Sequence, residues 1–530
     1  MRCERWADRL VRRPSVTGTA DEASFAAFLA ALLRESPAFE GWPDDVWLLD
    51  VPGGQHPRAC VLGLVRGSGT QTVVLTGHFD TVGTTNYGDL QPLACDPDGL
   101  LPALLQSLDA LPGDAAALAR DDLASGEFVP GRGLLDMKAG LAAALTAIEG
   151  FAADPARRGN LLFLAVPDEE ANSAGARAAA AALPDIAAAH CLALSAAINL
   201  DAVADPDDGS DGRTVALGTV GKLCPSALVI GRPVHAGYAY SGIGAASLGG
   251  ALAAEMEWSP ELGERMGATL LGMKDDRTAY DVTMPGSVWL YWNVLTETRQ
   301  AADLLARFER VARCTGDTLL AELRRRRAAV TGRDDALAPV TIVTYATLLQ
   351  KLLQAQPDAA ATIDAAAADL AQAGLDVPEQ CRRLTLMVAG LAQLEGPAIV
   401  LGFASMPYLP TMLEAPHLEP AIRAAVAQVA ARHDTTIGVT ARFPAICDMS
   451  VLGQANRSDI PPIAANTPLW GHGLDLSIAG IPIINAGPWG RDYHTRLERM
   501  HRDYGYEVLP DLVSTLARAL LDAARDVDGP

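Results

Sequence analysis

The sequence predicts an α/β protein: a catalytic domain with a mainly parallel sheet and helices on both faces, plus an inserted α+β domain. Three observations carry this prediction. Short apolar runs such as 73–76 and 161–166 contain β-branched or aromatic residues, as buried strands do. Ala/Leu-rich segments of helical length alternate with such runs. An Asp-rich stretch at 205–212 then interrupts the alternation and is typical of a linker.

The first part of the chain alternates between helices and strands. Helices are expected over 4–10, 23–35, 140–150 and 171–182, with some helix within 101–118. Strands are expected over 46–49, 60–65, 73–76, 161–166 and 191–200. This βαβ alternation favours a parallel sheet, and ligands of open α/β sheets bind beyond the carboxyl ends of the strands.

A different unit follows the linker. Its expected strands are 223–230, 287–295 and 398–403, and its expected helices are 244–257, 299–327 and much of 348–394. The α/β pattern returns with a helix at 420–432, a strand at 436–440, an apolar run at 480–484 and a last helix at 509–524. We therefore expect a discontinuous domain of residues 1–212 and 412–530, and an inserted domain of residues 213–411 with a helical insertion at about 315–396.

Composition narrows the class of protein. A chain of 530 residues is too long for one ordinary hydrophobic core, so two or more domains are expected. Its contents of 49% hydrophobic and 20% charged residues are usual for a globular enzyme. The net charge of −22 argues against binding to nucleic acid or to an anionic membrane. The eight Cys form no CxxC pair, and no secretory signal or transmembrane segment is apparent, so the cytoplasm is the expected location.

Three polar clusters, at 76–82, 131–138 and 167–170, contain the chemically active side chains. The first and third directly follow predicted strands. Their carboxylates and one imidazole would repel one another unless a cation lay among them. Carboxylate oxygen and imidazole nitrogen suit zinc, manganese or cobalt.

Each cluster also has a plainer explanation. His78 can bind a metal while Asp80 orients its ring, or the two can form an ordinary His–Asp pair. Asp136 can bridge two metals or cap a helix. Of Glu169 and Glu170, one can bind metal while the other acts as general base, or both can lie on a charged turn. Three such clusters in order, however, make coincidence a poor account.

The stretches 77–82, 131–140 and 167–170, with a late His494 followed by Glu498, resemble the di-zinc metallopeptidase family. This family includes aminoacylase, carboxypeptidase G, acetylornithine deacetylase and succinyl-diaminopimelate desuccinylase. Segments 166–175 and 487–490 look closest to the branch of the arginine-utilisation protein RocB, which hints at arginine catabolism. The resemblance covers most of the chain and is weakest over about 315–396.

The resemblance implies a role for each matching residue. His78 and Asp201 would bind the first metal, Glu170 and His494 the second, and Asp136 both, while Asp80 would orient His78 and Glu169 would be the general base. His235 matches a histidine of the inserted lid domain, which family dimers lend to the partner's site to polarise the scissile carbonyl. Asp205 is a rival for Asp201, and His472 and His501 are rivals for His494.

We therefore expect a metal-dependent hydrolase that cleaves an amide bond in a small peptide or N-acyl amino acid. Its cofactors would be two divalent ions per chain, with zinc preferred over cobalt and manganese. Its expected assembly is a homodimer joined through the lid. A two-metal phosphoesterase is one alternative, although no phosphate-binding loop stands out. A non-catalytic binding protein on the same scaffold is another, and the intact Glu169 argues against it.

Overall fold

The computed structural model describes residues 2–109, 111–204, 213–264 and 267–528. The chain divides into two compact units. The first unit comprises Met1–Thr219, Thr411–Ala455 and Ser477–Pro530, and the second comprises Val220–Pro410 and Asn456–Leu476. The Asp-rich linker at 205–212, and with it Asp205, lies outside the described residues. The short segment Asn456–Leu476, which we had expected in the catalytic domain, is part of the second unit.

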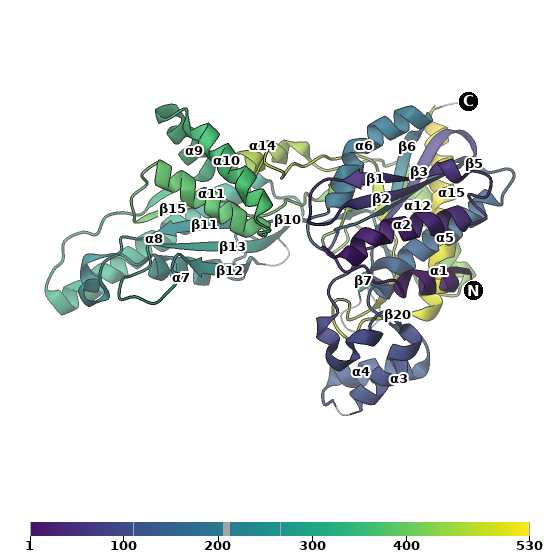
Figure 1. Ribbon diagram of the computed structural model, residues 1–530, viewed down its shortest axis with the longest axis horizontal. Coiled ribbons are helices and arrows are strands. Elements are labelled where there is room, and N and C mark those ends of the chain that lie inside the picture. Colours follow the sequence, from purple (N-terminus) through teal and green to yellow (C-terminus); the bar gives the residue numbers. More distant parts are fainter. Residues whose placement is uncertain (1, 110, 205–212, 265–266, 529–530) are drawn as a thin grey trace. The chain divides into compact units, whose positions relative to one another are not determined.

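The first unit is built on an eight-stranded sheet with a parallel centre (Figure 1). β5, β3, β6 and β18 run parallel, whereas β2 is antiparallel to both of its neighbours, β1 and β5, and β8 is antiparallel to β18. The sheet is therefore mixed, and it is parallel where the site residues lie. In spatial order the strands are β1 (Val46–Val51), β2 (Arg58–Arg66), β5 (Arg158–Val166), β3 (Ser68–His78), β6 (Ala193–Asn199), β18 (Ile483–Asn485), β8 (Thr214–Ala216) and β17 (Gly438–Thr440).

Helices cover both faces of this sheet. β5 is buried without a break from Gly159 to Val166, as expected for a strand that is covered on both sides. One face shares a hydrophobic core with α1 (Arg2–Val11), α2 (Ala20–Glu35), α5 (Ala139–Ala152), α12 (Glu419–Arg432) and α15 (Leu509–Asp528). α6 (Ala174–His190) packs on β1, β2 and β5 but contributes nothing to that core, so it covers the other face.

The register of the central strands brings the predicted site residues to one edge. His78, the last residue of β3, pairs with Val166, the last residue of β5. Thr76 of β3 pairs with Asn199, the last residue of β6. The chain segments that follow β3, β5 and β6 therefore leave the sheet side by side.

A second, four-stranded sheet of the first unit was not predicted. Its order is β4 (Phe128–Pro130), β20 (Arg499–His501), β19 (Trp489–Arg491) and β7 (Val203–Ala204). Arg499 of β20 pairs with Pro130 of β4, so the turn after β4 lies beside the loop before β20. The remaining elements of this unit are α3 (Pro97–Leu108), α4 (Asp114–Ser125), α13 (Met449–Leu452), and the paired strands β9 (Gly218–Thr219) and β16 (Thr411–Met412).

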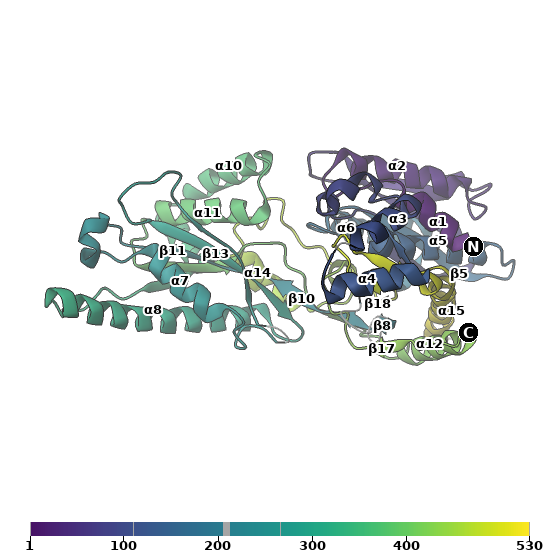
Figure 2. The same ribbon diagram turned by 90° about the horizontal axis from the view of Figure 1, so that it is seen from below.

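The second unit has a six-stranded, mostly antiparallel sheet. Figure 2 shows it between α7 and α8 on one side and α10 and α11 on the other. Its strands are β10 (Gly221–Leu223), β11 (Pro225–Ile230), β12 (Thr269–Asp275), β13 (Ser287–Thr296), β14 (Thr341–Thr344) and β15 (Ala398–Phe403). Its helices are α7 (Ala245–Met256), α8 (Ala301–Thr331), α9 (Tyr345–Ala355), α10 (Ala359–Gln372), α11 (Val377–Leu391) and α14 (Ile460–Asn466).

The predicted insertion at about 315–396 therefore needs correction. Its start falls inside α8, which continues unbroken to Thr331, because the apolar face of that helix stays buried as far as Leu320 and beyond. Within the same stretch, β14 joins the sheet as the parallel neighbour of β15. None of the helices in the described part of the chain has the length and apolar character that a membrane span requires.

Candidate metal centre

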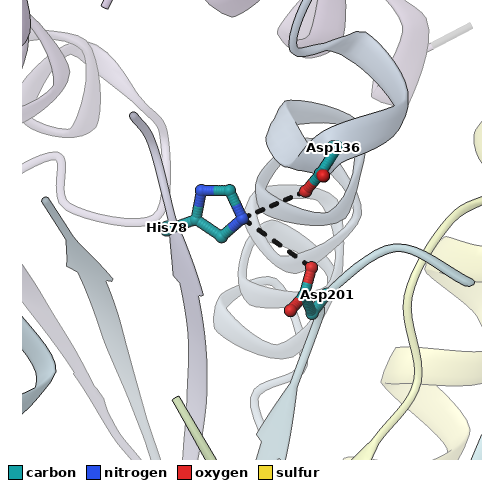
Figure 3. A group of neighbouring side chains, drawn as sticks. All are labelled: His78, Asp136 and Asp201. Carbon is teal, nitrogen blue, oxygen red and sulfur yellow. Dashed lines mark hydrogen bonds and ion pairs between the residues drawn. The ribbon is translucent and has the colours of Figure 1, made fainter. Parts of the chain in front are cut away.

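The first group of potential metal ligands surrounds the Nε2 atom of His78. This atom lies 3.1 Å from Oδ1 of Asp136 and 3.7 Å from Oδ1 of Asp201. Figure 3 shows both carboxylates on the Nε2 side of the buried ring. Asp201 follows β6 and is held by Asn485 of the adjacent β18, whose side-chain oxygen accepts the Asp201 N–H at 3.1 Å.

The second group contains Asp136, Glu170 and His494. Nε2 of His494 lies 3.0 Å from Oδ2 of Asp136 and 3.1 Å from Oε2 of Glu170. Asp136 thus presents one oxygen to His78 and the other to His494. It belongs to both groups, in the position that a bridging carboxylate requires.

The donors of both groups fit divalent metal ions. Two ligand atoms that are each about 2.1 Å from a tetrahedral ion lie about 3.4 Å apart. The separations of 3.0–3.7 Å between the imidazole nitrogens and the carboxylate oxygens agree with this value. Carboxylates and neutral imidazoles together are a ligand set that zinc, manganese and cobalt accept.

The concentration of buried carboxylates in the two ligand groups also favours the binding of cations. Burial raises the pKa of Glu169, Glu170 and Asp201, and neighbouring carboxylates raise it further. Burial alone would lower the pKa of His494, but Asp136 and Glu170 raise it to about 10. A metal ion among these groups would compensate the carboxylates and reverse these shifts.

Asp80 contacts more than the ring that it was expected to orient. Nδ1 of His78 lies 3.0 Å from the main-chain oxygen of Asp80 and 3.7 Å from its carboxylate. The buried carboxylate accepts the N–H groups of Glu169 and Glu170, at 3.1 and 3.3 Å, and the hydroxyl of Thr17 at 2.8 Å. Asp80 therefore fixes both the His78 ring and the backbone that presents the two glutamates.

Glu169 lies beside the ligands without joining them. Its Oε2 atom is 3.9 Å from Nε2 of His78, yet neither ligand group includes it. The turn before it is held by Asp168, which has a left-handed φ of 69° and forms a buried ion pair with Arg58. This turn directs Glu169 and Glu170 to different places, as their adjacency in the sequence had suggested.

The other histidines named from the sequence belong to neither ligand group. His235 is in the second unit, at the start of a 3-10 turn (Ala236–Ser241), where its exposed ring accepts the N–H of Gly237 at 3.1 Å. His472, also in the second unit, lies 3.6 Å from Asp364. His501 packs against Phe128 and Trp489.

Sequence reasoning missed several residues that support the site. Thr17 and Asn86 are not among the predicted site residues, and Arg132 enters the prediction only as part of the cluster at 131–138. The flanking glycines of Arg132 were a usable signal, because an arginine between two glycines sits on a tight turn. No local signal identifies Asn86 or Thr17, since their partners are distant in the sequence.

Known proteins resemble this chain over nearly its full length. The model of peptidase family M20/M25/M40 matches residues 104–527. The uncharacterized protein YqjN of Bacillus subtilis (strain 168) is 29% identical over 531 residues, which are 97% of this chain and 95% of YqjN. Protein RocB of the same organism is 27% identical over 562 residues, with 99% and 96% covered. The crystal structure of aminopeptidase PepT from Bacillus cereus ATCC 10987 shares the fold, with a TM-score of 0.53, 13% identity and 98% of both chains covered.

Proposed function

We propose that this chain, which belongs to peptidase family M20/M25/M40, hydrolyses an amide bond in a small peptide or an N-acyl amino acid. Membership of the family makes it a metallohydrolase that acts on peptides or amide bonds. The substrate class, the number of metal ions and the roles of individual residues are our proposals.

The proposed cofactors are two divalent ions, zinc in the first instance and cobalt or manganese as alternatives. His78 and Asp201 would hold one ion, Glu170 and His494 the other, and Asp136 both. When bound, the ions would acidify an attacking water and polarise the substrate carbonyl. The observation that supports two ions is the division of the Asp136 oxygens between His78 and His494.

Glu169 is the proposed general base. One observation supports this role: its carboxylate lies next to the ligands and outside both ligand groups. It is therefore free to accept a proton from the attacking water and to deliver that proton to the leaving amine. Burial raises its pKa well above the ordinary value for glutamate, which favours such a proton shuttle.

A substrate screen tests this function. Protein purified without chelator would be loaded with zinc, cobalt or manganese and incubated with dipeptides and N-acyl amino acids, including arginine derivatives suggested by the likeness to RocB. Mass spectrometry should detect an amine and a carboxylic acid as products. Release of phosphate from phosphoesters, with no amide cleaved, would overturn the proposal in favour of a phosphoesterase.

We further propose that the second unit is a lid and that it joins two chains into a homodimer. Support comes from its exposed apolar side chains. Leu271 and Met273 are exposed on β12, which pairs only with β13 among the described strands. Tyr238 and Tyr280 are exposed near His235, in segments joined by the bridge between His235 and Thr283. In such a dimer His235 would serve the site of the partner chain.

A further inference from the structure

We infer that the buried ion pair of Arg132 and Glu498 is a positioning element that sets the separation between Asp136 and His494. Both side chains are almost completely buried, at 1% and 0% exposure, and their charged groups are in direct contact. Neither residue belongs to a ligand group. The inference rests on the proposed two-ion centre, because the ligands that the pair positions are those of the second ion.

On one side the pair holds the turn that leads to Asp136. Oε1 of Glu498 accepts the N–H of Gly133 at 2.9 Å. Gly133 has a left-handed φ of 76°, and its own oxygen accepts the main-chain N–H of Lys138 at 2.9 Å. The main-chain N–H of Arg132 donates to Ala94 at 2.7 Å. Glu498 is thus attached to the turn only three residues before Asp136.

On the other side the pair holds the loop that carries His494. Nη2 of Arg132 donates to the main-chain oxygen of Thr495 at 3.2 Å and to the side-chain oxygen of Asn86 at 3.3 Å. The amide of Asn86 then donates to the main-chain oxygen of His494 at 2.9 Å. His494 has a left-handed φ of 66°, which is unfavourable for a residue with a side chain and persists only where the surroundings enforce it.

These contacts form a continuous circuit of interactions that includes His494 of the second ligand group. It runs from His494 through Asn86, Arg132 and Glu498, and returns along the chain to His494. The first group shares Asp136, but its other two members lack this support: His78 ends β3, and Asp201 follows β6 beside Asn485. Loss of the pair should therefore affect binding of the second ion more than binding of the first.

The test is a metal titration of the full-length protein by calorimetry, with Zn²⁺ as the probe and Co²⁺ spectra as a report on coordination geometry. His494→Ala identifies the step that belongs to the second site. Outer contacts of metal ligands typically contribute 10–100-fold to affinity. We expect Glu498→Gln to weaken the second step by about that factor and the first step much less. Glutamine keeps an acceptor for Gly133 but loses the charge that holds Arg132.

Two further variants keep the inference testable if Glu498→Gln folds poorly. Asn86 is exposed, so Asn86→Ala should fold normally and weaken the second step by about 10-fold, the lower end of the range. Glu149→Gln is the matched control, because it is the same substitution at another buried carboxylate of the first unit, whose contacts with Arg2 at 3.5 Å and with the hydroxyl of Ser36 at 3.0 Å lie away from both ligand turns. It should reduce stability and leave both steps unchanged.

The outcomes are distinct. Wild-type protein that binds two ions, with Glu498→Gln and Asn86→Ala binding them equally well, would overturn the positioning role. An equal loss at the second site in Glu149→Gln would also overturn it, because general destabilisation would then explain the effect. Wild-type protein that binds fewer than two ions would overturn the proposed metal centre itself.

Discussion

Replacement of Glu169 by glutamine tests the proposed mechanism most directly. Glutamine keeps the shape of the side chain but cannot accept a proton as a carboxylate does. Because Glu169 lies 3.9 Å from Nε2 of His78 and belongs to neither ligand group, the variant should retain both ions. General-base catalysis contributes about 10²–10⁴-fold to the rate. The expected decrease in kcat therefore corresponds to a loss of about 2.7–5.4 kcal/mol of transition-state stabilisation.

The assay combines turnover with metal analysis on the same preparation. We would measure kcat and KM for the best substrate of the screen, and the metal content of each sample by elemental analysis. Glu170→Gln is the matched control, because it removes the same charge one residue away. Since Glu170 lies 3.1 Å from Nε2 of His494, this variant should lose affinity for the second ion.

Either of two results would refute the reasoning. A Glu169→Gln variant that keeps most of the wild-type kcat would exclude Glu169 as the base. If Glu169→Gln lost an ion while Glu170→Gln kept both ions and lost turnover, the two roles would have to be exchanged.

Three further predictions concern the ions and the assembly. Wild-type protein should bind two ions per chain, and Asp136→Asn should weaken both sites, as measured by equilibrium dialysis, since Asp136 faces both histidines. Metal binding at neutral pH should release protons. The two carboxylates raise the pKa of His494 to about 10, so this histidine is protonated at neutral pH in the absence of metal, whereas an imidazole that binds a metal ion must be neutral. Calorimetry in buffers of different ionisation enthalpy would detect this release, and His494→Ala should reduce it. Finally, mixing inactive His235→Ala with inactive Glu169→Gln should restore some activity if His235 acts across a dimer, and no recovery despite proven subunit exchange would refute that arrangement.

Part of the site could be predicted from local sequence patterns, because His78, Glu169 and Glu170 lie at or just after the ends of predicted strands. An apolar run that ends in His78, and another that precedes Glu169 and Glu170, are local patterns. Parallel pairing of β3 with β5 and β6 then brings their carboxyl ends together. At this edge the local sequence patterns agree with the fold. Once the order of the strands is known, it follows that these residues lie together.

His494 and the residues that support it could not be predicted in the same way. His494 lies between β19 and β20, strands of only three residues whose sequences show no alternation. Their position depends on pairing between Arg499 and Pro130, which are far apart in the chain. The role of Arg132 follows from that pairing and from nothing in its immediate sequence except two glycines. The start of the predicted insertion, at about 315, fell inside α8 for a related reason: this helix packs on β14 and β15, which follow it in the chain.

The two ligand groups are therefore held by different kinds of structure. The first group is attached to strands of the central sheet, whereas His494 is held in a left-handed conformation by a loop, one exposed asparagine and one buried ion pair. Loops open locally at lower free energy than core strands do. We accordingly expect a chelator to remove the ion held by Glu170 and His494 before the ion held by His78 and Asp201. Cobalt-loaded protein treated with increasing chelator should pass through a one-ion state whose spectrum matches that of His494→Ala. Simultaneous loss of both ions, or an intermediate that matches Asp201→Asn instead, would show that the loop is as firmly held as the sheet.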